Sequence, residues 1–155
     1  MVRCVQCAGE RTVIRYVTNV ANIGNETFKV GDPANSSLAE YDPCHGHYHL
    51  KEYNKYQVFK AKDTKEKKPI KTGGKEGMCV LDGVQYDPFD ENVYGVPREP
   101  AQFRDCSNQG IGVGRSDEYA NHIACQFVDI TDLPAGLNYV LRYEPTYTPS
   151  QDMSP

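Results

Sequence analysis

Residues 45–61, HGHYHLKEYNKYQVFKA, predict two β-strands in succession, and the first carries a histidine at every second position. Successive side chains of a strand point to opposite faces, so His45, His47 and His49 would line one face about 6.6 Å apart. The twist of a strand can aim such a row of imidazoles at one point. Because imidazole nitrogens are common ligands of transition metals, this stretch predicts a three-nitrogen metal site.

The other apolar segments also favour short strands joined by turns and long loops. Residues 123–131, IACQFVDIT, are apolar on both faces and are expected to form a central strand, which turns at residues 134–136 and pairs with residues 138–144. Further strands are expected over residues 12–23, 27–30, 52–61 and 78–81, with Tyr56, Val58 and Phe59 in the core. No segment of about ten or more residues has helical apolar spacing. The sequence predicts an all-β fold with a sandwich-like core of short antiparallel strands.

Two polar stretches separate these predicted strands. Residues 60–71 are basic and hydrophilic, which favours the solvated tip of a hairpin. Residues 82–114 are rich in Gly, Pro, Asn and Asp and have no clear period. A loop of that length in a compact domain is usually functional or pinned by crosslinks, and Cys79 and Cys106 bracket most of it. We therefore expect long, disulfide-pinned loops.

The composition narrows the class of protein. A chain of 155 residues suits a single domain over residues 1–155. The net charge of −4 offers no basic surface for nucleic acid, and no run of about 18 apolar residues could span a membrane. Six cysteines favour a disulfide framework in a secreted protein. The alternatives are reduced thiols in a cytosolic enzyme and a zinc site at Cys4 and Cys7. No signal peptide is recognisable at the start, so we expect a trimmed or mature form.

Two segments together resemble the catalytic domain of the lysyl oxidases, which are copper- and quinone-dependent amine oxidases. They are DPCHGHYHLKEY at residues 42–53 and ACQFVDIT at residues 124–131. Between them, in the order and spacing of that family, lie GGKEGMCVLD (73–82), CSNQGIGVG (106–114) and DEY (117–119). The resemblance covers residues 11–147, most of the chain. It implies one lysyl-oxidase-like catalytic domain.

The resemblance also implies a site and a set of disulfides. His45, His47 and His49 would be the Cu(II) ligands. Lys75 and Tyr119 would be crosslinked to form the cofactor lysine tyrosylquinone. The family's disulfides imply that Cys79 is bonded to Cys106. They also imply that Cys44 and Cys125 each pair with one of Cys4 and Cys7, with Cys4–Cys44 and Cys7–Cys125 favoured by order.

The chain departs from the family's pattern at several positions. Gly74 stands where the family usually has a histidine, Met78 replaces an aromatic residue, and Phe127 replaces a tryptophan. The usual acidic residue before Asp82 is missing, and the closing strand of larger relatives is not expected before residue 155. No departure affects a predicted ligand or crosslinking residue. We therefore expect differences in substrate choice and in the efficiency of cofactor formation.

The implied activity is the oxidative deamination of primary amines by O2, which yields an aldehyde, ammonia and hydrogen peroxide. The substrate would be a lysine-containing protein or a small primary amine. Candidates for the general base are Asp82, Asp117, Glu118 and Asp129, and His122 is an alternative fourth metal ligand or a partner of one. Two other hypotheses remain open from the sequence: a three-histidine zinc hydrolase or hydratase, and a non-catalytic copper-binding extracellular structural module.

Overall fold

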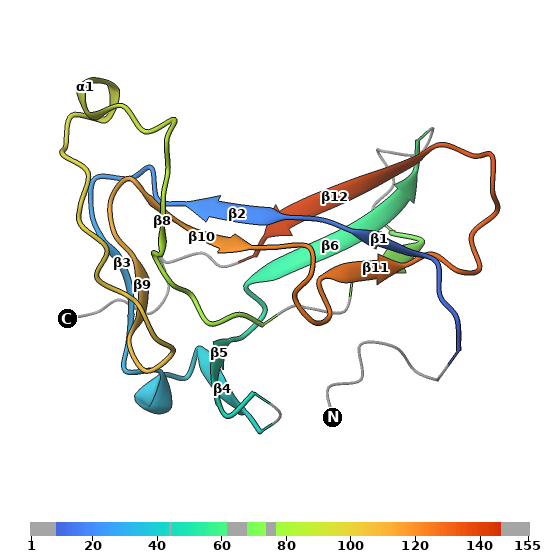
Figure 1. Cartoon of the computed structure of the whole chain (residues 1–155), viewed down its shortest axis with the longest axis horizontal. Helices are drawn as coiled ribbons and strands as arrows, with labels where there is room; N and C mark the ends of the chain where they lie inside the picture. The colour runs from blue at the N-terminus through green and yellow to red at the C-terminus, as the bar shows by residue number, and fades with distance from the viewer. Residues whose placement is uncertain (1–8, 44, 62–67, 74–76, 147–155) are drawn as a thin grey trace. The chain divides into compact units, whose positions relative to one another are not determined.

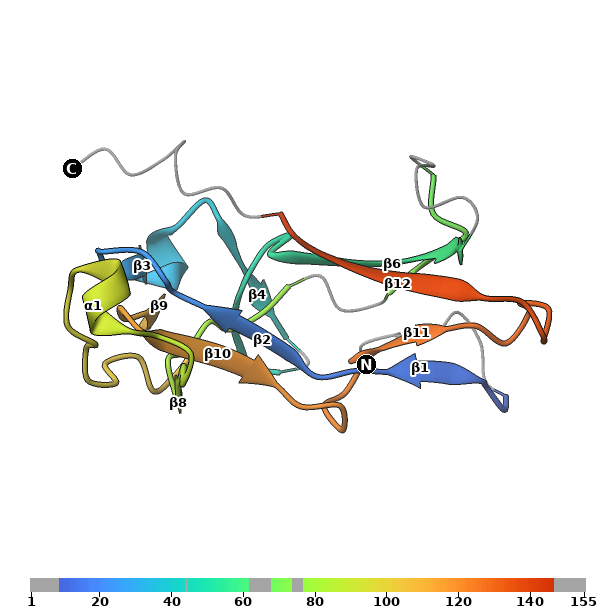
Figure 2. The same cartoon turned by 90° about the horizontal axis from the view of Figure 1, so that it is seen from above.

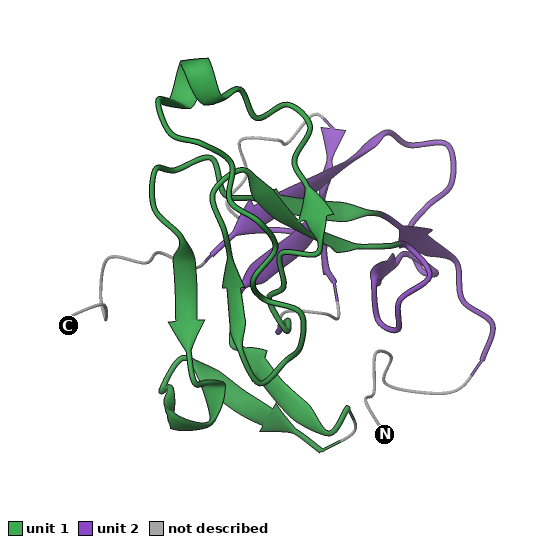
Figure 3. Cartoon of the chain, turned by 60° about the vertical axis from the view of Figure 1, so that its left-hand side comes forward, with its two compact units in different colours: residues 1, 17–51, 78–120 green, residues 2–16, 52–77, 121–155 purple. Residues whose placement is uncertain are grey.

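The computed structural model describes residues 9–43, 45–61, 68–73 and 77–146, and these form short antiparallel strands with little helix (Figure 1 and Figure 2). The chain divides into two compact units (Figure 3). Unit 1 holds residues 17–51 and 78–120, and unit 2 holds residues 2–16, 52–77 and 121–155. The predicted all-β class is confirmed. The single domain over residues 1–155 stays a prediction.

Unit 1 contains small antiparallel sheets with the strand orders β2-β10-β8, β3-β9 and β4-β5. Its strands are β2 (Thr18–Ala21), β3 (Phe28–Gly31), β4 (Ala39–Asp42), β5 (His47–Leu50), β8 (Val84–Gln85), β9 (Gln109–Ile111) and β10 (Arg115–Tyr119). The 3-10 turn η1 (Pro33–Asn35) and the one-turn helix α1 (Glu91–Tyr94) complete the unit. Asp90 caps the start of α1 with its side chain, and Gly95 ends the helix in the left-handed conformation. The buried apolar residues are Leu50, Met78, Val80, Phe89, Phe103, Ile111 and Val113.

The long loop of residues 82–114 is pinned at both of its ends. The fully buried carboxylate of Asp82 accepts hydrogen bonds from the backbone N–H groups of Gln102, Phe103 and Gly112. The disulfide between Cys79 and Cys106 closes most of the same loop, as predicted. Buried backbone N–H groups need partners, and the carboxylate supplies them where no sheet does.

Unit 2 is built from two small sheets that pack face to face, β1-β11 and β12-β6-β7. Their strands are β1 (Val13–Arg15), β6 (Asn54–Lys60), β7 (Lys71–Thr72), β11 (Phe127–Asp129) and β12 (Tyr139–Pro145). Figure 2 shows the β6 and β12 layer beside the β1 and β11 layer. The predicted core residues Tyr56, Val58 and Phe59 are buried, together with Val128. The ring centroid of Tyr16 lies 4.4 Å from that of Tyr56. Burial raises the pKa of Tyr16 well above its ordinary value, and the charge of the nearby Tyr56 phenol raises it further.

Two predictions about strand pairing are wrong. Residues 123–131 do not form a central strand, because only β11 is extended and, among the described residues, it pairs with β1 alone. Cys125 has a φ of 65°, so the chain turns just before β11. The expected partner of this segment, residues 138–144, pairs instead with β6, where Leu141 lies opposite Val58. The apolar character of residues 123–131 reflects the burial of a turn as well as a strand.

Other predicted strands have different bounds. Residues 12–23 form two strands, β1 and β2, rather than one, while β3 and β6 begin and end within about two residues of their predicted bounds. Residues 78–81 form only an isolated bridge between Met78 and Leu50. β6 and β7 pair as the hairpin over residues 60–71 requires, and its tip at residues 62–67 lies outside the described residues. Among the residues described, no helix is long and apolar enough to cross a membrane.

The disulfide framework is confirmed in part. Cys79 and Cys106 are bonded, and Cys125 is also disulfide-bonded. Cys4, Cys7 and Cys44 lie outside the described residues, so the partner of Cys125 and the remaining pairing stay predictions.

Replacing both Cys79 and Cys106 with alanine should lower the free energy of unfolding by about 3.5 kcal/mol, because the unfolded chain regains the entropy of a loop closed over 27 residues. Urea unfolding of the double variant and the wild type, followed by circular dichroism, measures the difference. Val84→Ala, on an exposed side chain, is the control. A decrease of less than about 1 kcal/mol in the free energy of unfolding would show that this disulfide does not restrict the conformational entropy of the unfolded chain.

Candidate metal centre

The three histidines lie in the hairpin of β4 and β5, but only two of them are on a strand. β5 begins at His47, and His45 lies in the preceding turn. Asp42 pairs with His47 at the end of the hairpin, and the Gly46 N–H donates to the Asp42 carbonyl across the turn at 2.8 Å. The prediction of a single strand bearing all three rings is therefore wrong at His45. Strand alternation fails there because Gly46 has a φ of 73°, a left-handed conformation that glycine adopts without strain.

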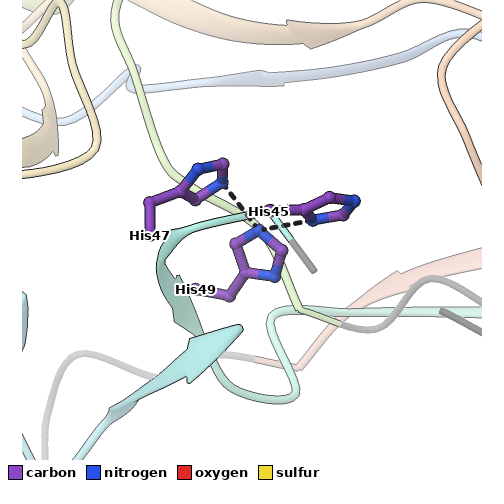
Figure 4. Close-up of side chains that lie close together, drawn as sticks. All are labelled: His45, His47 and His49. Carbon is purple, nitrogen blue, oxygen red and sulfur yellow. Dashed lines mark hydrogen bonds between the residues drawn. The ribbon is translucent and has the colours of Figure 1, made fainter. Parts of the chain in front are cut away.

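The turn nevertheless brings the three imidazoles together (Figure 4). His47 Nε2 lies 3.0 Å from His49 Nε2, and His45 Nδ1 lies 3.3 Å from that same atom. One ring nitrogen of each histidine lies within 4.8 Å of the others, and burial increases from His45 through His47 to His49. No second group of this kind is recorded in the described part of the chain. His122 is exposed, belongs to unit 2 and is not a member of the group.

This donor set fits a transition-metal ion. Two nitrogens that each bind one ion at about 2.0 Å lie about 2.8–3.3 Å apart for bond angles between about 90° and 109°. Both distances to His49 Nε2 fall in that range. Lone pairs of neutral imidazoles that face each other this closely repel unless a proton or a metal cation lies between them. Imidazole nitrogens suit Cu(II), Zn(II) and Ni(II), and the affinity order favours copper.

A carboxylate that the sequence analysis missed borders these rings. Asp42 Oδ2 lies 3.2 Å from His45 Nδ1 and 3.5 Å from His49 Nδ1. Asp42 Oδ1 accepts a hydrogen bond from the His45 backbone N–H at 3.3 Å. The signal in the sequence is an acidic residue three positions before the first histidine. Strand alternation does not place it beside the rings, whereas the turn does.

A buried carboxamide attaches the histidine hairpin to the rest of unit 1. Gln109 on β9 is fully buried. Its Nε2 donates to the Tyr48 carbonyl at 2.7 Å and to the Cys106 carbonyl at 3.0 Å. Its Oε1 accepts from the Val80 backbone N–H at 3.1 Å. One side chain thus connects the hairpin, the disulfide and residues 78–80.

Residues 78–80 also contact the tyrosine of the predicted cofactor. Leu50, at the end of β5, exchanges backbone hydrogen bonds with Met78 at 2.7 and 3.2 Å. Tyr119, at the end of β10, donates its phenolic hydrogen bond to the Cys79 carbonyl. Lys75 lies outside the described residues. The histidine hairpin and Tyr119 are therefore both hydrogen-bonded to one short segment, which begins three residues after Lys75.

The four candidate bases have different environments. Asp82 is committed to backbone N–H groups of the long loop. Glu118 is exposed. Asp129 belongs to unit 2, and hydrogen bonds from the side chain and backbone of Thr131 hold its pKa below the ordinary value. Asp117 is buried on β10, two residues before the tyrosine of the predicted cofactor.

Comparison with known proteins gives a consistent set of matches. A family model described as lysyl oxidase matches residues 3–151. The chain is 32% identical over 149 residues to lysyl oxidase homolog 3B of Danio rerio, and this match covers 92% of the chain and 16% of that protein. It is 30% identical over 135 residues to lysyl oxidase homolog 3 of Homo sapiens, with 86% and 16% covered. It is 33% identical over 150 residues to protein-lysine 6-oxidase of Rattus norvegicus, with 93% and 32% covered. The chain therefore spans about a sixth of the two homologs and about a third of the rat protein.

Gly46→Ala and Gly136→Ala should each lower the free energy of unfolding by about 1–2 kcal/mol, because each puts a side chain at positive φ. The two φ angles are 73° and 78°, and neither new Cβ would meet an atom within 4 Å. Only Gly46→Ala should also weaken Cu(II) binding, by about tenfold or more, since it displaces His45 from His47.

Isothermal titration with Cu(II) measures this difference, with Gly136→Ala as the matched control for backbone strain. Equal copper affinity in the two variants would contradict a role for the Gly46 turn in assembling the rings.

Proposed function

Because the chain belongs to the lysyl oxidase family, we propose that it catalyses the copper-dependent oxidative deamination of primary amines, with lysine side chains of proteins as the main substrate class. The products would be an aldehyde, ammonia and hydrogen peroxide, with O2 as the oxidant. The family acts on lysine in proteins. The observation that carries the proposal for this chain is the convergence of one nitrogen each from His45, His47 and His49.

The proposed cofactors follow from the same family and from the donor set. His45, His47 and His49 would hold Cu(II), and Lys75 and Tyr119 would form lysine tyrosylquinone. Bound copper and the quinone supply the redox chemistry with O2 that amino-acid side chains lack. Two of the imidazole nitrogens already lie at ligand-to-ligand separations from the third, and rotation of the rings would bring the remaining pair, within 4.8 Å of each other, to the same separation around Cu(II).

The surroundings of Tyr119 support its pairing with Lys75. Its hydroxyl is hydrogen-bonded to the carbonyl of Cys79, four residues after Lys75 in the chain. Four fully extended residues span at most about 14 Å, so covalent connectivity keeps the Lys75 backbone within that distance of Cys79. A lysine side chain adds several ångströms of reach. Chain connectivity is therefore compatible with the proposed crosslink.

Asp117 is the proposed general base. Residues two apart on a strand share a face, so Asp117 and Tyr119 lie on the same face of β10. Asp117 is buried, whereas Glu118 faces the other way and is exposed. In the proposed reaction the Asp117 carboxylate takes a proton from the carbon next to the substrate nitrogen. Its burial keeps bulk water away from that transfer.

Charge and crosslinking support the remaining parts of the proposal. A net charge of −4 favours the approach of cationic amines. Disulfides such as Cys79–Cys106 persist in oxidising compartments, which favours a secreted, extracellular protein.

Wild-type protein incubated with Cu(II) in air should yield a tryptic peptide that links Lys75 to Tyr119, because the quinone crosslink survives denaturation. Lys75→Arg and Tyr119→Phe should yield none and should release no peroxide with a panel of amines. Mass spectrometry and a peroxide assay measure the two outcomes. Tyr139→Phe is the matched control, since this phenol also donates to a backbone carbonyl, that of Pro134.

The same experiment separates the competing hypotheses. Only unlinked peptides from a copper-loaded, oxygenated wild-type sample would overturn the amine oxidase. A zinc hydrolase would keep its activity in Lys75→Arg, and a structural copper module would bind copper without turnover.

Asp117→Asn should lower kcat/KM for amine oxidation by about 100-fold or more, the usual contribution of a general base. The variant should still form the linked peptide, and urea unfolding should show that it is folded. Glu118→Gln removes the same charge from the next residue, which is exposed. This variant should keep a kcat/KM near that of the wild type. A loss of less than about threefold in Asp117→Asn would rule out this role.

A further inference from the structure

Asp42 stands beside the three histidines with its carboxylate between two of the rings, and we propose that it is a positioning residue of the metal centre. It would fix the ring of His49 and raise the affinity of the three imidazoles for a divalent cation. The inference rests on the proposed metal site at His45, His47 and His49 and adds a residue to it.

The first support is the division of labour between the two carboxylate oxygens. Oδ1 accepts from the His45 backbone N–H at 3.3 Å, which secures the turn. Oδ2 faces the rings and lies 3.2 Å from His45 Nδ1 and 3.5 Å from His49 Nδ1. A side chain that served only to cap the turn would have no need to present its second oxygen to both rings.

The second support is the geometry of His49. Its Nε2 is the atom that both other histidines approach, at 3.0 and 3.3 Å. Its Nδ1 lies 3.5 Å from Asp42 Oδ2. When Nδ1 carries the proton and donates it to Asp42 Oδ2, Nε2 is left unprotonated with its lone pair directed at the other two rings. A carboxylate in this position selects the tautomer and the orientation that a metal ligand needs.

The third support is partial burial. The Asp42 side chain is 19% exposed and the His49 side chain 9% exposed. A negative charge that is shielded from bulk solvent acts on a nearby dication more strongly than a surface carboxylate does. Asp42 is held there by the hairpin, because it pairs with His47 at the last position of β4.

Glu40 provides a matched control on the same strand. It lies two residues before Asp42, opposite His49 in the register, and is exposed. It carries the same charge on the same face of β4. Glu40→Gln therefore removes one negative charge close to the rings without removing the carboxylate that contacts them.

The experiment measures Cu(II) affinity by competition titration for wild type, Asp42→Asn, Asp42→Ala and Glu40→Gln. Pulsed electron paramagnetic resonance counts the imidazoles bound to copper, and urea unfolding checks each fold. Asp42→Ala should weaken copper binding by about 10–100-fold, the usual effect of removing such a partner, with three imidazoles still bound. Asp42→Asn keeps an acceptor for the His45 N–H and should also be weakened. Glu40→Gln should stay within about threefold of wild type.

Each other outcome overturns a defined statement. Wild-type affinity in folded Asp42→Ala overturns the role of Asp42 and leaves the three-histidine site standing. A change in the copper signal that marks the loss of an oxygen ligand overturns positioning in favour of direct ligation. Equal losses in Glu40→Gln and Asp42→Asn reduce the effect to general charge and overturn the specific contact. Wild-type protein that binds no Cu(II) through imidazole overturns the proposed function and this inference together.

Discussion

The carboxamide of Gln109 is the interaction on which the organisation of unit 1 depends. It is fully buried and bonded to three backbone groups from three different segments, at Tyr48, Val80 and Cys106. An unsatisfied polar group in such a position costs about 1–3 kcal/mol, so each bond strongly disfavours displacement of the segment that it holds. The strands around it are only two to five residues long and could not fix these segments by ladder hydrogen bonds alone.

The same hydrogen bonds position the histidine hairpin and Tyr119. Leu50, which follows His49, is hydrogen-bonded to Met78 through the backbone. The carbonyl of the next residue, Cys79, accepts a hydrogen bond from the hydroxyl of Tyr119. The histidine hairpin and Tyr119 are thus both hydrogen-bonded to the same short backbone segment, Met78 and Cys79. Such indirect attachment would suit the proposed metal centre, because its histidines lie in a short hairpin with a glycine in its turn, and the hairpin alone has little to hold it rigid.

The sequence predicted which histidines come together more reliably than the geometry that brings them together. Spacing alone grouped His45, His47 and His49, which do converge, but it assumed a strand where Gly46 turns the chain. Asp42 was missed because its approach to the rings depends on that turn. Residues 123–131 were misassigned because apolar composition reports burial and not pairing, and the choice of β6 as the partner of β12 is a long-range choice that local pattern does not encode. Tyr56 and Val58 were placed correctly because alternation along one regular strand puts them on the same buried face. Phe59 points to the opposite face and is buried as well, which alternation alone does not predict.

The pairing of early strands with late ones has a consequence for biosynthesis. Ile14 on β1 lies opposite Val128 on β11, and Val20 on β2 lies opposite Asp117 on β10. Neither β1 nor β2 has its partner until β11 and β10 have also left the ribosome. Folds dominated by such distant contacts form over milliseconds to seconds, and their unpaired edges stay open to aggregation in the interval. A newly made chain with this pairing is therefore exposed to aggregation for longer than one built from local hairpins.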